Sequence, residues 1–313
     1  MDYETVEEVL EKVGQIHISD SSVWRQAQDW GEGFQAMFEK ERIRSNLLLG
    51  RWGVPCRRGE PKGRMGVAMD GANIHIRHEG WKELKVGSLF DVEVRPTLDK
   101  ETGDRIELAH AVNNSYVAHL GGPEIFGQMV WAEASRRDWE QAADTEVIGD
   151  GAPWIWNLAL DHFYDSRQIV DWYHAMEHLD DAAKLLKGEE GTAKTLWYNA
   201  RETTLFEGYA ARIAQELEAA SQGHPSVAEE LQTEAGYFRK NQHRMNYQEM
   251  REEGWAIGSG MVESAAKQFK ARFAGPGMRW SRPGAERLIP VRAAVMSGRF
   301  EDIWDEVYNS PPN

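Results

Sequence analysis

The sequence has very little cysteine: Cys56 is the single one among 313 residues. One cysteine cannot form a disulfide within the chain, and it cannot build a multi-cysteine zinc site, so the sequence predicts a protein of a reducing compartment. Long apolar runs are also missing, since none reaches the roughly 20 residues that a helix needs to cross a bilayer. The acidic, amphipathic start is unlike a secretory signal. We therefore expect a cytoplasmic protein without a membrane segment.

Positive charge is scarce over the chain as a whole. Lysine and arginine number 36 against 51 acidic residues, which gives a net charge of −15. Such a balance argues against a nucleic-acid binder. The positive charges are concentrated in two tracts, however: residues 51–64 carry five basic residues against one acid, and residues 264–300 carry eight against one. A locally basic tract indicates a polyanion-binding surface better than the total charge does, although an ordinary solvated helix face is the alternative.

A strand–helix–strand pattern in the middle of the chain organises the predicted fold. It begins with a β-type run, 145–149, that delivers Asp150 at its end. Residues 154–163 have the apolar spacing of a helix, and a second β-type run, 168–173, leads to His174. Strand, helix and strand within about 30 residues form a βαβ unit with two parallel strands. Open α/β sheets place chemistry at the carboxyl ends of such strands, which is where Asp150 falls.

The rest of the chain is expected to surround this unit. Alternating patterns before it predict antiparallel strands and then a helix from Pro123, so the sheet should be mixed. Helical patterns over 2–13, 22–31 and 34–51 begin with a helix-turn-helix-like layout, as if only the end of a longer recognition module were present. We therefore predict an α/β protein with five segments: a helical N-terminal segment (1–50), a basic linker (51–64), the first part of the core (65–174), an all-helical insertion (175–254), and the last part of the core with basic C-terminal helices (255–313).

Three acidic residues fall at positions suited to catalysis. Asp70 and Asp150 each end a β-type run and are followed by a glycine, which lets a substrate approach closely. Glu263 lies in the first turn of a predicted helix, after a Gly-Ser-Gly loop. Three such oxygen donors can hold a pair of Mg²⁺ ions, which promote phosphoryl transfer when they lie about 3.5–4 Å apart. Each acid taken alone could equally be a helix cap or a surface residue.

Five short segments together carry a family resemblance: VAMDGANI (67–74), VIGDGAPWIWN (147–157), VDWYHAMEHL (170–179), IGSGMVESAAKQFKAR (257–272) and GMRWS (277–281). They resemble transposases of bacterial insertion sequences, in particular the ISKra-type group of the DDE superfamily, over roughly residues 65–304. The resemblance implies a ribonuclease H-like mixed sheet flanked by helices, with an all-helical insertion. It implies a catalytic triad of Asp70, Asp150 and Glu263 that binds two Mg²⁺ or Mn²⁺ ions, and a supporting Asp-x-x-His pair, Asp171 and His174.

The resemblance also implies a function. A transposase of this type cuts DNA at the ends of its element and joins the freed 3′-hydroxyl to target DNA. Its partner would be double-stranded DNA, held by a homodimer or larger assembly near the bacterial nucleoid. We predict DNA contacts from the basic C-terminal tract, from one tryptophan within it, and from the second N-terminal helix: Lys267, Lys270, Arg272, Arg279, Arg282, Trp280, Trp24 and Arg25.

Two other interpretations stay open. His174, Glu177 and His178 form the H-x-x-E-H pattern of inverted zinc peptidases, with two histidines on one helix face and a glutamate as base. Against it, His174 is predicted to end a β-type run, and Asp70 and Asp150 would be left unexplained. A non-catalytic DNA-binding protein, domesticated or truncated, would keep the basic tract but make no use of the three acids.

Overall fold

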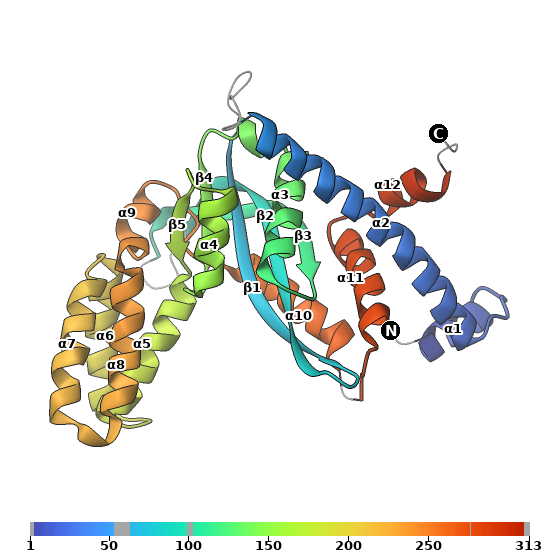
Figure 1. Ribbon diagram of the computed structural model, residues 1–313. Coiled ribbons are helices and arrows are strands. Elements are labelled where there is room, and N and C mark those ends of the chain that lie inside the picture. Colours follow the sequence, from blue (N-terminus) through green and yellow to red (C-terminus); the bar gives the residue numbers. More distant parts are fainter. Residues whose placement is uncertain (1–2, 53–62, 99–102, 276, 310–313) are drawn as a thin grey trace.

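The computed structural model (Figure 1) describes four stretches of the chain: residues 3–52, 63–98, 103–275 and 277–309. Cys56 and most of the predicted basic linker lie outside these residues. The described part is a mixed α/β structure in which helices pack on a five-stranded sheet and a group of helices stands to one side (Figure 1). Within these stretches no helix has the length and the apolar character needed to cross a bilayer.

The sheet has the strand order β3-β2-β1-β4-β5. Strands β1, β2 and β3 are antiparallel neighbours, whereas β4 and β5 run parallel to β1. The predicted mixed sheet is therefore confirmed. The strands are β1 (Arg64–Ile76), β2 (Gly80–Leu98), β3 (Arg105–His119), β4 (Thr145–Gly149) and β5 (Arg167–Val170).

The predicted βαβ unit is present as β4, helix α4 (Pro153–His162) and β5. All five residues of β4 are buried, since the strand has a neighbour on each side and helices pack on the sheet. β5 is shorter than the predicted run 168–173, because Asp171 caps helix α5 (Trp172–Lys187) by accepting the backbone N–H of His174. His174 thus lies in the first turn of a helix, and the prediction that it ends a strand is wrong.

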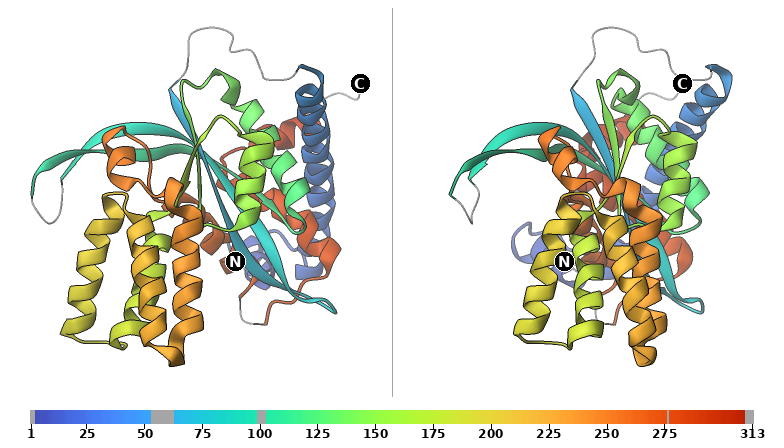
Figure 2. Two further views of the ribbon diagram at one scale, coloured as in Figure 1. Left: turned by 60° about the vertical axis from the view of Figure 1, so that its left-hand side comes forward. Right: turned by 90° about the vertical axis from the view of Figure 1, so that its left-hand side faces the viewer.

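Asp70 was predicted to end a strand, and this prediction is wrong. It lies in the middle of β1. Residues 71–76 stay extended because they pair with Gly80–Lys85 of β2. This pairing is a tertiary constraint that the local pattern does not contain. At the opposite end, β2 and β3 continue past the start of β1 as a two-stranded arm, with 93–98 paired to 105–110, and the arm curves away from the sheet (Figure 2).

Helices cover both faces of the sheet. α3 (Pro123–Arg136) and α4 pack side by side on one face, where Phe126 and Val130 of α3 lie against Gly87 of β2. α10 (Gly260–Phe273) packs on β1 and β2 from behind in the view of Figure 1. α11 (Arg282–Met296) packs on β3. The main apolar core lies between these layers.

The two predicted helices 22–31 and 34–51 form one continuous helix, α2 (Asp20–Trp52), so their separation is wrong. Gly31 does not end a helix but allows α2 and α11 to approach closely. A Cβ atom at Gly31 would lie 2.3 Å from the carbonyl oxygen of Arg287 in α11. α2 therefore packs on the rest of the protein, through α3 and α11, over much of its length.

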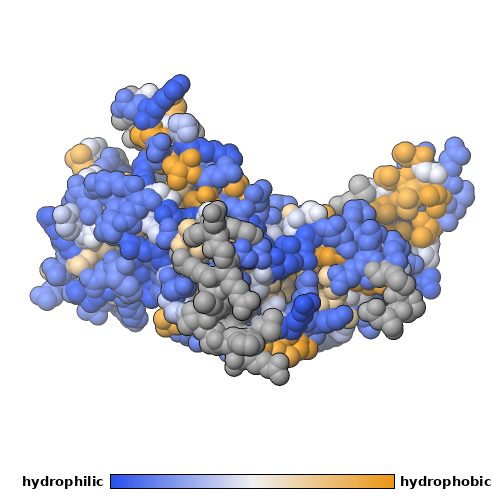
Figure 3. Space-filling model, turned by 90° about the horizontal axis from the view of Figure 1, so that it is seen from above, coloured by the Kyte–Doolittle hydropathy of each residue, from blue (hydrophilic) through white to orange (hydrophobic). Residues whose placement is uncertain are grey.

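Helices α5 to α9 form what we call the helical block, which stands beside the sheet (Figures 1 and 2). After α5 it consists of α6 (Thr192–Phe206), α7 (Ala210–Gly223), α8 (Ala228–Asn241) and α9 (Tyr247–Glu252). Helix α1 (Tyr3–Lys12) and the two-stranded arm both project on the side of the sheet that α10 covers (Figure 2). Seen from above, the outline of the molecule is hollowed between projecting parts (Figure 3).

Candidate active site

Three aspartates stand at the same level of three neighbouring parallel strands. The pairing of β1 with β4 ends one residue before Asp70 and Asp150, and the pairing of β4 with β5 ends one residue before Asp150 and Asp171. Neighbouring strands lie about 4.8 Å apart, so this register brings together residues that are far apart in the sequence. The two strand-borne acids of the predicted triad, Asp70 and Asp150, are therefore neighbours.

The carboxylates of Asp70 and Asp150 repel each other. Burial raises the pKa of Asp70 above its usual range, and the charge of Asp150 raises it further. The N–H of Gly71 opposes this shift by donating to Asp70 Oδ1 over 2.6 Å. Asp150 Oδ1 accepts the N–H of Ala152 over 2.8 Å, which folds the start of the loop back onto the carboxylate. Two close, partly buried carboxylates of this kind favour the binding of a cation.

Asp171 is fully buried and holds two elements together. Its Oδ1 accepts a hydrogen bond from the backbone N–H of His174 over 2.8 Å. The same oxygen is hydrogen-bonded to His174 Nδ1 over 3.1 Å. Its Oδ2 accepts the N–H of Ser259, which directly precedes α10. Burial alone would raise the pKa of Asp171, but these hydrogen bonds outweigh it and hold that pKa below its usual range. Asp171 thus joins the start of α5 to the start of α10.

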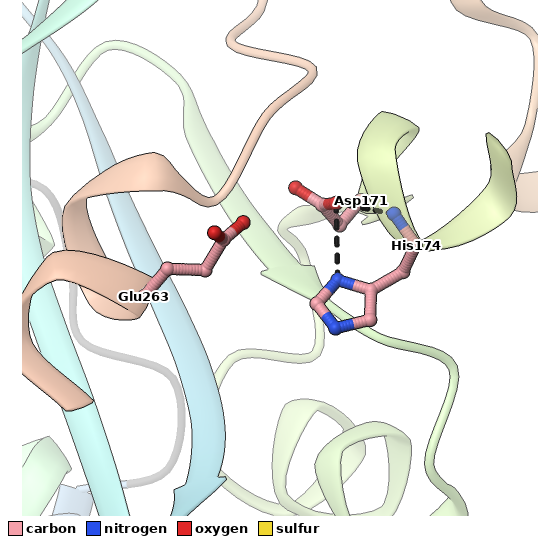
Figure 4. A group of neighbouring side chains, drawn as sticks. All are labelled: Asp171, His174 and Glu263. Atoms are coloured by element: carbon pink, nitrogen blue, oxygen red, sulfur yellow. Dashed lines mark hydrogen bonds and ion pairs between the residues drawn. The ribbon is translucent and has the colours of Figure 1, made fainter. Parts of the chain in front are cut away.

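Glu263 reaches the site from the first turn of α10. Its side chain points toward Asp171 and His174 (Figure 4), and one ligand atom of each of the three residues lies within 4.8 Å of the other two. Ser259, at the N-cap position of α10, makes no capping bond with its side chain. Its Oγ instead donates to Glu263 Oε1 over 3.2 Å. The loop before α10 therefore orients the glutamate.

The predicted triad divides into two adjoining parts. Asp70 and Asp150 form one, and Glu263 belongs to the other, which is the one group of three candidate metal ligands found among the described residues: Asp171, His174 and Glu263. His174 connects them electrostatically, since it lowers the pKa of Asp70 and its own pKa is raised in part by Asp150. The hydrogen bond with Asp171 is the main reason that the pKa of His174 rises to about 9.

The donor set fits a hard divalent cation. Asp70, Asp150 and Glu263 offer carboxylate oxygens, which suit Mg²⁺ and Mn²⁺ better than soft metals. The mutual repulsion of Asp70 and Asp150 is the feature of this structure that a bound cation would relieve. Asp171 is less suited to be a ligand, because both of its oxygens already accept hydrogen bonds.

The alternative zinc site is not assembled. His174 and His178 do lie one turn apart on α5, as that pattern requires. His178 Nδ1, however, bonds Glu234 Oε2 over 2.7 Å, and its ring stacks on Tyr237. Across the described residues, no group of three candidate ligands contains both histidines.

The predicted DNA-contacting residues differ in their exposure and in their ion pairs within the protein. Lys267 and Lys270 are exposed on the same side of α10 as Glu263, and Lys270 acts electrostatically on Asp70. Lys267 forms one long ion pair, at 3.7 Å, with Glu263 Oε2. Arg282, in contrast, forms two shorter ion pairs, with Glu79 and Glu286, at 2.6 and 3.2 Å. Lys267 and Lys270 are therefore better placed for phosphate contacts than Arg282 is.

The remaining candidates are more dispersed. Trp280 donates its indole N–H to the carbonyl of Phe273 over 3.0 Å and packs against that ring, which is a structural use of the side chain. The Arg272 guanidinium lies over the Trp280 ring, 5.5 Å from its centroid. Arg279 is exposed nearby. Trp24 and Arg25 are exposed near the start of α2, where the Arg25 guanidinium bonds Ser21 and Ser22.

Sequence reasoning missed Tyr237, which lies on α8 in the helical block. Its hydroxyl donates to the backbone carbonyl of Asp150 over 2.9 Å. Gly151 was the one available signal, since a residue without a side chain next to a candidate catalytic acid is typical of a close approach. The sequence alone could not say what approaches there.

An open cavity of about 850 Å³ borders the site. It is lined by residues of the two-stranded arm, the helical block and the loop before α10. Its lining includes Tyr173, two residues after Asp171, and Met261, two residues before Glu263. The cavity therefore opens beside the segments that carry Asp171 and Glu263, although neither acid lines it.

Comparison of the sequence with protein-family models and with curated proteins finds no match.

Proposed function

We propose that the chain is a DDE-type DNA transposase that cuts and joins DNA strands with divalent cations. The mixed five-stranded sheet with flanking helices is compatible with the ribonuclease H-like core that the sequence resemblance implies. One observation carries the proposal: the strand register sets Asp70 beside Asp150, while α10 brings Glu263 toward the same region from far along the chain. A protein that only binds DNA has no physical need for this convergence of acids.

The proposed ligands of two Mg²⁺ or Mn²⁺ ions are Asp70, Asp150 and Glu263. When bound, such ions activate the attacking oxygen and stabilise the leaving one. His174 would be a cation at neutral pH and would attract the phosphate, because the hydrogen bond with Asp171 raises its pKa to about 9. Lys267 and Lys270 would contact phosphates farther along the strand. Transposition requires two element ends at once, so we expect a homodimer or a larger assembly on DNA.

Both steps are displacements at phosphorus. In cleavage, the oxygen of a water bonds to the phosphorus at the element's end and the bond to the 3′ oxygen breaks, which leaves a 3′-hydroxyl. In strand transfer, the oxygen of that hydroxyl bonds to a phosphorus of the target. The 3′ oxygen of the target leaves and takes up a proton. No net oxidation or reduction occurs in either step.

The direct test is Asp150→Asn, which keeps the shape of the side chain and removes its charge. Metal-dependent nicking of supercoiled plasmid DNA should fall to background, because an amide is a weak ligand for a hard cation. Binding of the same DNA in a gel-shift assay should be unchanged or stronger. Asp161→Asn is the matched control, since Asp161 is an exposed acid on α4. Equal nicking by wild type and Asp150→Asn would rule out the proposed mechanism.

The non-catalytic alternative has one observation in its favour. Asp70 and Asp150 do not join Glu263 in a single group of ligand atoms within 4.8 Å of one another. If the chain is only a DNA-binding protein, the wild type will bind plasmid DNA without nicking it in either Mg²⁺ or Mn²⁺.

A further inference from the structure

The helical block approaches the proposed catalytic loop through α8, where Tyr237 forms a hydrogen bond with it. Its phenolic O–H donates to the backbone carbonyl of Asp150 over 2.9 Å. With the bond from the Ala152 N–H to Asp150 Oδ1, this contact holds Asp150 at two points, one on the main chain and one on the side chain. Strand β4 thus places Asp150 at the carboxyl-end edge of the sheet, and helix α8 holds its main chain in position.

Gly151 makes the contact possible. It has a φ of +104°, which favours glycine over every other residue. A Cβ atom at this position would also lie only 2.7 Å from the Tyr237 ring. Both the conformation of the loop and the space beside it therefore depend on the missing side chain.

The position of Tyr237 is itself fixed within the helical block. The imidazole of His178, on α5, stacks on the phenol ring with the centroids 3.6 Å apart and the planes at 22°. Glu234, one turn before Tyr237 on α8, bonds His178 Nδ1 over 2.7 Å. These contacts explain the use of His178 and Glu234, to which the proposed chemistry assigns no role.

We propose that Tyr237 is a positioning residue for Asp150, through which the helical block sets the geometry of the carboxylate pair Asp70 and Asp150. The expected effect on catalysis rests on the proposed function, whereas the expected effect on the loop that carries Asp150 does not. Burial, together with the charge of Asp150, raises the pKa of Tyr237, so its hydroxyl remains a hydrogen-bond donor at every pH of interest. The helical block is accordingly part of the active site and not only an insertion beside it.

Tyr237→Phe tests the inference, since it removes the donor and keeps the ring that stacks on His178. Tyr209→Phe is the matched control, because Tyr209 is an exposed tyrosine of the same block. The first readout is amide hydrogen exchange over residues 149–153. It should become faster in Tyr237→Phe and stay unchanged in Tyr209→Phe, because the loop loses one of its two anchors.

The second readout is the affinity for Mn²⁺, measured by calorimetry without DNA, and the Mn²⁺ concentration that gives half-maximal nicking. Groups that orient metal ligands typically contribute roughly 10–100-fold to metal affinity or activity. We expect a loss of this size in Tyr237→Phe, with nicking partly restored by excess Mn²⁺ and with DNA affinity unchanged. Gly151→Ala should raise the Mn²⁺ requirement in the same way, because the added methyl group would push the Tyr237 ring away from the loop.

The two proposals fail in different ways. Unchanged loop exchange and unchanged Mn²⁺ affinity in Tyr237→Phe would overturn the positioning role even if the wild type nicks DNA. Faster loop exchange without nicking by any variant would support the contact between the block and the loop but overturn the transposase mechanism. If Tyr237→Phe lowers the melting temperature but leaves the Mn²⁺ requirement unchanged, the role of Tyr237 is packing and the positioning role is overturned.

Discussion

At the scale of single residues, Glu146 is a buried carboxyl whose pKa is strongly shifted. It lies in β4 and is fully buried. Its Oε2 accepts the backbone N–H of Ala256 over 3.1 Å, in the segment between α9 and α10. Burial raises the pKa of Glu146 to about 8. The side chain is thus a neutral carboxylic acid at pH 7, and it anchors the segment that leads to Glu263.

The buried acid should make stability depend on pH in a defined direction. The folded state binds the Glu146 proton more tightly than the unfolded state does, so this group lowers the free energy of unfolding as pH rises from 4.5 to about 8. Glu146→Gln keeps an acceptor for Ala256 and cannot ionise. In urea titrations at several pH values, the variant should therefore gain stability relative to wild type as pH rises through this window. Glu189→Gln, at an exposed loop position, should follow the wild type. Parallel curves for wild type and Glu146→Gln would contradict the assignment.

At the scale of helices and strands, two glycines inside helices should respond in opposite ways to the same substitution. Gly31→Ala would place a methyl group 2.3 Å from the Arg287 carbonyl oxygen. Overpacking of this kind typically costs about 1–3 kcal/mol, which outweighs the gain in helix propensity. At Gly236 of α8, no described atom lies within 4 Å of such a methyl group, so alanine should stabilise by about 0.5–1 kcal/mol. Chemical unfolding of the two variants measures both effects, and a stabilised Gly31→Ala would refute the close packing of α2 on α11.

The elements that the sequence predicts well are those whose pattern is local. The βαβ unit from β4 to β5 is readable because its apolar periods change within a few residues and Pro153 marks the start of the helix. The continuity of α2 is not readable, because a glycine inside a helical pattern looks like an end until the neighbouring helix is known. The length of β1 is set by its pairing with β2, so the pattern that stops at Asp70 underestimates it.

The same division applies to the candidate site. Asp70 and Asp150 could be proposed as partners because each follows an apolar β-type run, and the strand register now explains their proximity. Asp171 and His174 could be proposed as a pair from the resemblance, but the bond that Asp171 accepts from the Ser259 N–H could not, since it joins a buried side chain to a residue far along the chain. Tyr237 belongs to the same class, because it meets Asp150 only through the folding of the helical block.

At the scale of the whole molecule, the distribution of charge matters more than its total. The net charge is −15, and the face seen from above is largely hydrophilic (Figure 3). The DNA binding that we propose would therefore require a local positive surface, because the net charge of the molecule repels DNA. The side covered by α10 is the best candidate, because Lys267 and Lys270 are exposed there next to the acidic site, and the arm and α1 project on either side of it (Figure 2).

Replacing both α10 lysines by glutamine should reduce the salt dependence of DNA binding. Each phosphate contact releases counterions and contributes about 0.9 to the slope of log affinity against log salt concentration. The slope for Lys267→Gln with Lys270→Gln should thus fall by about 2, for any sequence of duplex DNA, because phosphate contacts do not read bases. Fluorescence anisotropy with a labelled duplex at several salt concentrations gives the slope.

Arg282→Gln is the informative control, since it removes one positive charge from the same basic tract. Its guanidinium pairs with Glu79 and Glu286 and bonds the carbonyl of Leu120, so its loss should lower the melting temperature while leaving the salt slope of DNA binding unchanged. If Arg282→Gln lowers the slope and the double lysine variant does not, DNA binds near the start of α11 instead of along α10. Glu263 would then lie off the path of the DNA, and the role of α10 in presenting it to the scissile phosphate would have to be abandoned.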